Sequence, residues 1–526
     1  MSLKVVAVAA PQFPEGIVGK ATLNSVDPAS LFNACRLAAL MAELGRGAWG
    51  ESNWTEGRQR RRDTLLLMHS LKDDGPAFER LLQEVEPNLL ILGAMSLCLP
   101  GAVACAKTAK EMLGDRVCVV LGGWHASETI YADGKDEIVH HPGSPVLLMS
   151  EKLIDPVFDL VIAGEGEHVI PWLGERIADH MRNGYLPSSV VSNLDGLSEV
   201  PGRWIVAWNE NGTLRATRGS RSRTVLDGMP PPCEMFGIRS SFDVFAGRMT
   251  AHVFSDSGNG CTYDCNFCSE RRSIREPHFE LDHAPQRLFQ QLRSAVKVIQ
   301  QDSPTRKASA FVEDSTLLAG SERHLRLLVD LLSFAQLDLR FGAQLTVDQI
   351  LKLPDGVIRD LKSVGLDYLF VGIETPNPLL VGGFSKDVGF RTAPWISRTE
   401  HAVQRLSNIG IRTGAAVLFG LGENHESRLG LLQRIVEWQN VYGSPDPVSL
   451  NWAVQHPLKG RDGGTGYRYH QWGVPSGPWI DAFSEFGEAS VHFPVVGQRS
   501  PILCEVQEIT RVQRCIYAQR RAKTNT

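Results

Sequence analysis

The chain has no long hydrophobic run and no excess of basic residues. No segment approaches the roughly 20 apolar residues that a transmembrane helix needs, so we expect no membrane partner. Lys and Arg total 54 against 59 Asp and Glu, which leaves a net charge of −5. This balance gives no electrostatic reason to expect nucleic acid as a partner. Internal repeats and low-complexity tracts are also missing, so the sequence is typical of an ordinary globular protein.

Cysteine is sparse and is not arranged in dense pairs. Ten Cys are spread over 526 residues, which indicates a reducing compartment rather than a disulfide scaffold. The apolar run after Lys4 is too short for a signal peptide and is typical of a buried first strand. We therefore expect a cytoplasmic protein, and nothing in the sequence indicates its oligomeric state.

The length of the chain predicts several domains, because single hydrophobic cores stop growing well below 526 residues. Composition and patterning divide it into four segments. They are a doubly wound α/β domain over residues 1–185, a linker with a hairpin over 186–248, a partial barrel over 249–455, and a C-terminal extension over 456–526. The extension is a candidate cap on the substrate side.

Strands alternate with helices in the first segment. Apolar runs predict strands over 4–9, 88–94, 117–121 and 158–163, and a 3.6-residue period predicts a helix over 31–44. This alternation favours a parallel, doubly wound sheet, which binds ligands at the carboxyl ends of its strands. Gly pairs follow two of these strands, in Gly122-Gly-Trp-His125 and Gly164-Glu-Gly-Glu167.

Further strand–helix units follow the linker. The predicted strands are 250–254, 308–312, 339–344, 368–373, 413–419 and 449–454, with helical patterns between them. Six such units predict a partial (β/α)6 barrel, which resembles the eight-fold barrel in placing its chemistry at the strand carboxyl ends.

Three cysteines, Cys261, Cys265 and Cys268, lie in a Gly-rich turn directly after the first barrel strand. Thiolates select zinc, copper(I) or iron–sulfur clusters. A structural zinc site takes four protein ligands, and no fourth Cys or His follows at zinc-site spacing. Three thiolates on a [4Fe–4S] cluster would leave one iron open for a substrate or cofactor. A zinc site and free loop cysteines are the alternatives.

The cysteine motif, with the aromatic Phe267 before its last Cys, resembles the radical S-adenosylmethionine (radical SAM) superfamily. The ends of later barrel strands are similar to that superfamily as well. The resemblance implies a [4Fe–4S] cluster on the three cysteines and a SAM site that includes Phe267, Glu313, Asp314, Glu374, Thr375, Gly420 and Gly422.

The Gly-rich strand ends of the first segment resemble the cobalamin-binding domain found ahead of some radical SAM domains. The resemblance implies cobalamin contacts from Ser96, Gly122, Gly123, Trp124, His125, Gly164, Glu165, Gly166 and Glu167. The Asp-x-His-x-x-Gly motif that supplies a lower cobalt ligand in that family is missing after the first strand. His69 and His125 are alternative ligands, although a lone His is more often a packing residue.

Together these resemblances imply a cobalamin-dependent radical SAM methyltransferase, which methylates an unactivated carbon of a small-molecule or carrier-bound substrate through methylcobalamin and a 5′-deoxyadenosyl radical. Relatives act in antibiotic biosynthesis, and an electron donor of the flavodoxin or ferredoxin type is implied. Aromatic and polar residues of the C-terminal segment are candidate substrate contacts: Tyr467, Tyr469, His470 and Glu488. The alternatives are a radical cyclase or rearrangement enzyme without methyl transfer, and a non-catalytic iron–sulfur or zinc module.

Overall fold

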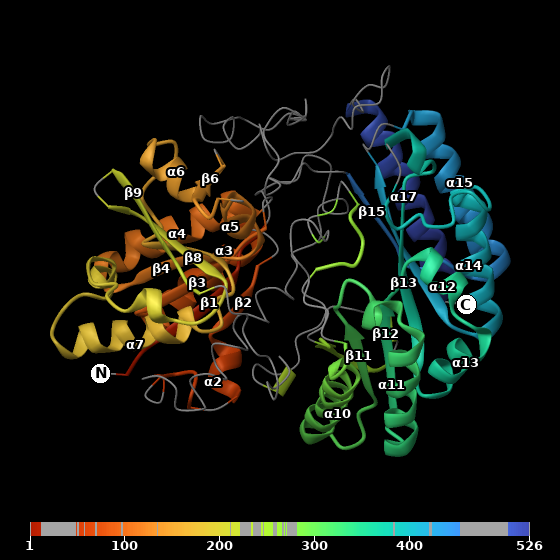
Figure 1. Cartoon of the computed structure of the whole chain (residues 1–526), viewed down its shortest axis with the longest axis horizontal. Coiled ribbons are helices and arrows are strands. Elements are labelled where there is room, and N and C mark those ends of the chain that lie inside the picture. Colours follow the sequence, from red (N-terminus) through yellow and green to blue (C-terminus); the bar gives the residue numbers. More distant parts are fainter. Residues whose placement is uncertain are drawn as a thin grey trace.

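The computed structural model describes most of the chain in two folded bodies. The described residues are 2–11, 49, 52–56, 58–68, 71–95, 98–133, 135–141, 143–210, 212–220, 233–234, 244–245, 247–255, 260–265, 268, 270, 281–381, 384–419, 423–452 and 503–524. The helix predicted over 31–44 lies outside them. Figure 1 shows one sheet with its helices in red to yellow and a second in green to blue.

The N-terminal body is built on a seven-stranded sheet. Its strands are β1 (Val5–Ala9), β2 (Leu65–Leu67), β3 (Leu89–Gly93), β4 (Cys118–Gly122), β7 (Leu160–Gly164), β8 (Trp204–Glu210) and β9 (Thr213–Arg218), in the order β2-β1-β3-β4-β7-β8-β9. The first five pair in parallel, and β8 and β9 add antiparallel. The fully buried pattern of β1 fits a sheet that is covered on both faces.

Two hydrophobic clusters fill the two faces of this sheet. Helices α3 (Leu71–Val85) and α4 (Leu99–Leu113) contribute to one of them. Helix α7 (Val169–Arg182) contributes to the other, together with Trp49 and Trp54. The remaining regular elements are short: α2 (Arg58–Asp63), α5 (Trp124–Thr129), β5 (Ile130–Ala132), β6 (Ile138–His140), α6 (Pro145–Ser150) and the 3₁₀ turns η3 (Gly114–Arg116), η4 (Pro187–Ser192) and η5 (Leu197–Glu199).

The hairpin that the sequence analysis assigned to the linker, β8–β9, is part of the N-terminal sheet. Strand β8 pairs with β7 from Val161–Ala207 to Gly164–Trp204. Trp204 and Val206 are buried in the cluster of the α7 face, whereas Ile205 and Ala207 are buried in the opposite cluster. Apolar side chains on both faces of β8 make it a covered strand, and this explains why it lies in the sheet. The predicted domain boundaries stay a prediction.

The C-terminal body is a half barrel. Its parallel strands are β10 (Met249–Val253), β11 (Ala308–Val312), β12 (Leu339–Gln344), β13 (Leu366–Glu374), β14 (Arg412–Phe419) and β15 (Val448–Trp452), each paired with its neighbour in the chain. The helices are α10 (Ala284–Asp302), α11 (Glu322–Ala335), α12 (Val347–Lys352), α13 (Asp355–Ser363), α14 (Trp395–Ile409), α15 (His425–Tyr442) and α17 (Leu503–Thr524), with 3₁₀ turns η6 (Leu317–Gly320) and η7 (Pro378–Val381). The predicted α/β architecture, a doubly wound sheet plus a six-stranded partial barrel, is confirmed.

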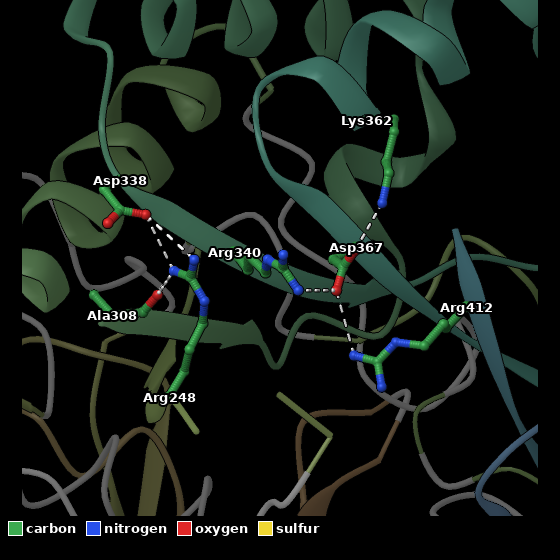
Figure 2. A network of polar contacts seen from close by, with 7 residues as sticks. All are labelled: Arg248, Ala308, Asp338, Arg340, Lys362, Asp367 and Arg412. Atoms are coloured by element: carbon green, nitrogen blue, oxygen red, sulfur yellow. Dashed lines mark hydrogen bonds and ion pairs between the residues drawn. The ribbon is translucent and has the colours of Figure 1, made fainter. Parts of the chain in front are cut away.

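Charged side chains form ion pairs between neighbouring barrel strands at their amino ends (Figure 2). The Asp367 carboxylate at the start of β13 lies 2.6 Å from Lys362 Nζ, and it also pairs with Arg340 and Arg412 on the two neighbouring strands. Burial alone would raise the pKa of Asp367, but the hydrogen bond and charge of Lys362, with the two arginines, hold that pKa below its usual range. These charges connect β12, β13 and β14 at the end of the barrel opposite the one where barrel enzymes carry their chemistry.

The last helix, α17, packs on the barrel. Ile509 and Ile516 belong to the same hydrophobic core as the barrel strands. Arg428 of α15 is 1% exposed and pairs both with Glu423, 2.7 Å away, and with Glu505 of α17, 3.5 Å away. A buried guanidinium between two carboxylates fixes the position of α17, because removing either partner would leave an uncompensated buried charge. In the described part of the chain, no helix is both long enough and apolar enough to cross a membrane.

Candidate functional site

The cysteine loop starts from a fixed point at the carboxyl end of β10. Ser255 donates from its backbone N–H to both carboxylate oxygens of Asp314, at 3.1 and 3.2 Å, and its hydroxyl donates to the same carboxylate. Arg287 donates to the Ser255 carbonyl at 3.2 Å. Asp314 is 2% exposed and follows β11. Asp314, which the resemblance places at the SAM site, thus holds the residue from which the cysteine loop departs.

The loop itself is closed by backbone hydrogen bonds. Cys261 donates to the Glu270 carbonyl at 2.7 Å, and Cys268 donates to the Cys265 carbonyl at 3.1 Å. Asp264, at the tip, donates to Ser385 Oγ at 2.9 Å, although the two residues lie 121 positions apart. The three cysteines are therefore held from within the loop and also by the segment that follows β13.

Each of the three thiol sulfurs accepts a backbone N–H. Tyr263 donates to Cys261, Lys386 donates to Cys265, and Glu270 donates to Cys268. Burial raises the pKa of all three thiols, and these donors oppose it because they stabilise the thiolate. A set of sulfurs with matched donors fits a cluster that binds three thiolates, whose sulfurs are commonly hydrogen-bonded.

The described residues contain no preformed site for a single metal ion. Among the described residues, no group of three or more His, Cys, Asp or Glu side chains is placed to hold one ion. A zinc site needs four ligands at about 2–2.3 Å from one point. In a cubane cluster each thiolate binds a different iron, so the sulfurs stand further apart while still sharing one site. Cys261 raises the pKa of the Cys265 thiol, and both raise the pKa of the Cys268 thiol, because one negative thiolate disfavours another nearby.

Lys386 and Glu374 form a buried ion pair beside the thiols. Lys386 Nζ lies 2.6 Å from Glu374 Oε1 and donates to the Gly372 carbonyl at 3.0 Å. Burial would lower the pKa of Lys386, but Glu374 and the Cys265 and Cys268 thiols raise it, so that the ammonium form is favoured. Glu374 ends β13 in the left-handed region, with φ 63°. This backbone strain at a strand end is typical of functional sites.

The other predicted SAM contacts differ in their surroundings. Thr375 is fully buried, and its hydroxyl has no hydrogen-bond partner among the described residues. An orphaned buried hydroxyl of this kind fits a bound group that would accept or donate there. Glu313 pairs instead with His252 Nδ1 on the adjacent strand β10. Phe267, Gly420 and Gly422 lie outside the described residues, so their roles stay predictions.

A pocket lies at the carboxyl ends of β1, β3, β4 and β7 in the N-terminal body. The strand order changes direction between β1 and β3, and open sheets bind ligands at such a switch point. Of the predicted cobalamin contacts, five line this pocket: Gly122, Gly123, Trp124, Gly164 and Gly166. The lining also includes Ala10, Met95 and Cys98, which the sequence analysis did not single out.

The glycines that line the pocket differ in how far chain packing requires glycine at their positions. A Cβ on Gly164 would lie 2.3 Å from the Arg203 carbonyl oxygen, and one on Gly123 would lie 2.8 Å from the Ala94 backbone. Both also have positive φ, so chain packing alone explains them. A Cβ on Gly122 would meet only Ile162 O, at 3.7 Å, an ordinary contact. Packing does not require glycine at 122, and its small size there keeps the pocket open.

Three other predicted cobalamin contacts that the structure describes, His125, Glu165 and Glu167, are not among the residues that line the pocket. His125 is fully buried, and its Nε2 is 2.9 Å from the Gly143 carbonyl oxygen, a partner typical of a packing histidine. Glu165 accepts a hydrogen bond from the Arg203 N–H at 3.0 Å, and Glu167 is half-buried just before α7. Ser96 and His69 lie outside the described residues, as do the candidate substrate contacts Tyr467, Tyr469, His470 and Glu488.

A model of a known protein family matches the segment that forms most of the barrel. The family model of the radical SAM superfamily matches residues 256–435, from the root of the cysteine loop into α15. The matched segment is a radical SAM domain. No curated protein sequence matches the chain.

Two solved structures are similar to most of the chain. TsrM from Kitasatospora setae, a radical S-adenosylmethionine methyltransferase with cobalamin and a [4Fe–4S] cluster bound, is 16% identical, with 86% of this chain and 72% of that chain covered and a TM-score of 0.48. OxsB, a cobalamin-dependent S-adenosylmethionine radical enzyme with aqua-cobalamin bound, is 14% identical, with 82% and 52% covered and a TM-score of 0.48. Similarity this distant leaves the substrate of the radical SAM domain open.

The radical SAM domain also contains site residues that sequence reasoning missed. Lys386 and Ser385 contact the cysteine loop from the segment after β13, and Ser255 anchors its root. None of them belongs to a motif. The only sequence signal was position, since each lies within about a dozen residues of the carboxyl end of a predicted strand.

Proposed function

We propose that this chain is a cobalamin-dependent radical SAM methyltransferase that acts on a small-molecule or carrier-bound substrate. The observation that carries the proposal is the set of three thiols, each with a backbone N–H donor, at the carboxyl edge of a radical SAM domain. The same chain also carries a second α/β sheet with a pocket at its own switch point.

The residues of the barrel support a bound [4Fe–4S] cluster and SAM. Cys261, Cys265 and Cys268 would hold the cluster, and Glu374 and Thr375 would contact SAM. When bound, the cluster supplies the electron that cleaves SAM, and cobalamin supplies the methyl group. The protein's part is to bind, orient and exclude water. Asp314 and Ser385 do this for the cysteine loop by fixing its root and its tip.

The N-terminal pocket supports cobalamin as the second cofactor. Its floor is formed by strand ends whose small residues, Ala10, Gly93 and Gly122, leave backbone accessible to a ligand. Gly122 is the most telling of these, because the fold does not require glycine there. No lower cobalt ligand from the protein is proposed, since the ring of His125 is bonded to Gly143.

The finer parts of the proposal rest on the resemblance stated from the sequence. They are an unactivated carbon as the methyl acceptor, a role in antibiotic biosynthesis, a flavodoxin- or ferredoxin-type electron donor, and a cytoplasmic location. The ten cysteines are spread over the sequence without dense pairing, which supports a reducing compartment. Tyr467, Tyr469, His470 and Glu488 stay the candidate substrate contacts.

The test is anaerobic purification with cobalamin, followed by metal analysis and by incubation with SAM and dithionite. We expect about four iron atoms and one cobalt per chain, together with 5′-deoxyadenosine. Replacing Cys261, Cys265 and Cys268 by Ala should abolish iron binding and SAM cleavage but keep cobalt. Cys504→Ala is the matched control, because Cys504 is an exposed thiol on α17.

Three outcomes would contradict parts of this proposal. Zinc in place of iron would refute the cluster. Iron without cobalt would refute the assignment of the N-terminal pocket. A product whose mass equals that of the substrate, rather than exceeding it by one methylene, would replace methyl transfer by cyclisation or rearrangement.

A further inference from the structure

Lys386 acts on the cysteine site through its backbone N–H and through its side-chain ammonium. The neighbouring Ser385 accepts a hydrogen bond from Asp264 of the cysteine loop at 2.9 Å, which brings Lys386 to the thiols. The Lys386 backbone N–H donates to the Cys265 sulfur, and its positive charge opposes the rise that burial gives to the pKa of Cys261 and Cys265. The side chain is only 10% exposed, so little water screens these interactions. Two carboxylates, Glu270 and Glu374, act on the same thiols with the opposite sign.

The position of Lys386 is strongly determined. Its Nζ is held by Glu374 at 2.6 Å and by the Gly372 carbonyl at 3.0 Å, and it lies 5.6 Å from the centre of the Phe384 ring. The backbone on its C-terminal side is fixed as well, because Asp387 pairs with the buried Arg398. A long side chain held at this many points keeps its charge at one distance from the sulfurs.

A fixed cation beside the thiols acts on whatever negative charge the site carries. Each thiolate adds a negative charge, and one electron taken up by a bound cluster adds another without breaking any bond. The attraction between the ammonium and the site therefore grows on reduction. Hydrogen bonds to the sulfurs and nearby charges are among the features that set the reduction potential of such clusters.

We propose that Lys386 is a positioning residue that sets the reduction potential of the cluster bound by Cys261, Cys265 and Cys268, with Glu374 as the opposing charge. The inference rests on the proposed function, since it requires the cluster. It predicts that removing the cation makes the potential more negative and that neutralising Glu374 makes it more positive.

The test is a dithionite titration of the reconstituted full chain, followed by electron paramagnetic resonance. Lys386→Met keeps the backbone donor to Cys265 and removes the charge, so we expect a more negative midpoint potential than in the wild type. Lys386→Arg should restore most of the shift, and Glu374→Gln should move the potential in the opposite direction. Lys362→Met is the matched control, because Lys362 also lies 2.6 Å from a carboxylate, at the other end of β13.

The outcomes separate this inference from its alternatives. Equal potentials in Lys386→Met and the wild type, at equal iron content, would overturn it and leave the proposed function standing. A purely structural role would lower thermal stability without opposite shifts from Lys386→Met and Glu374→Gln, and would also overturn it. If Lys386→Met loses iron while Lys386→Arg retains it, the positive charge at this position stabilises the bound cluster, which supports the inference. Loss of iron in both variants contradicts the inference. A wild-type chain that binds no iron would overturn the proposed function and this inference together.

Discussion

Arg398 is the residue whose replacement tests the support of the cysteine loop most directly. It lies in α14, is 5% exposed, and pairs with Asp348 of α12 and with Asp387. It also donates to the Ala393 carbonyl at 3.1 Å and stacks 5.4 Å from the centre of the Trp395 ring. The two carboxylate side chains are only 12% and 5% exposed. Arg398→Met would keep much of the packing and leave two buried carboxylates without this partner.

The expected loss in the free energy of unfolding of Arg398→Met follows from the burial of these ion pairs. Breaking a buried ion pair by removing one partner costs about 3–5 kcal/mol, because a desolvated charge is left behind. A typical domain is stable by about 5–15 kcal/mol, so the variant should still fold. The cost should be greatest in the segment from Phe384 to Arg398, which carries Ser385 and Lys386 to the cysteine loop.

The assay combines urea unfolding with labelling of the apo protein by a thiol reagent. We expect Arg398→Met to lose about 3–5 kcal/mol and to label faster at Cys261, Cys265 and Cys268. Arg326→Met is the control, since its partner Glu322 lies on an exposed helix face and such pairs are worth about 0.3–0.5 kcal/mol. A loss below about 1 kcal/mol in Arg398→Met, comparable to the control, would refute the reasoning.

Two further predictions concern the pocket end of the N-terminal sheet and the amino end of the barrel. Gly122→Leu should weaken cobalamin binding in an absorbance titration without changing the melting temperature. Gly164→Ala should lower the melting temperature, because its Cβ would lie 2.3 Å from Arg203 O. Equal effects of the two variants on stability would contradict the assignment of Gly122 to the pocket. Asp367→Asn should destabilise the barrel at neutral pH. Because the pKa of Asp367 is lowered in the folded state, its stabilisation is present above its unfolded pKa of about 4 and is lost as pH falls through the folded value. Urea unfolding over a pH series should show the two proteins converging at acidic pH, and a constant difference would argue against it.

The strands of the barrel were predictable because their apolar runs are short and bounded by polar residues. The predicted ranges 308–312 and 339–344 coincide with β11 and β12. The hairpin β8–β9 was found but placed in the linker, because pairing of β8 with β7 is a long-range contact. A local sequence pattern predicts a hairpin, but it does not predict which sheet the hairpin joins.

The site was predictable where spacing carries the chemistry and not where contacts come from distant segments. Cys261, Cys265 and Cys268 are close in sequence, so their grouping was visible at once. Lys386 reaches Cys265 from 121 positions further along the chain, in a segment with no motif. Asp314 was singled out as an acidic strand end, but its bonds to Ser255 exist only because β10 and β11 pair in the folded barrel.

The packing of α17 has a consequence for the order of events during synthesis. The barrel core includes Ile509 and Ile516, and the buried Arg428 finds its second carboxylate at Glu505. These residues leave the ribosome some 240 positions after Cys268. The core therefore closes only late in translation, whereas the N-terminal sheet, complete at β9, is free to fold while the barrel is still being made.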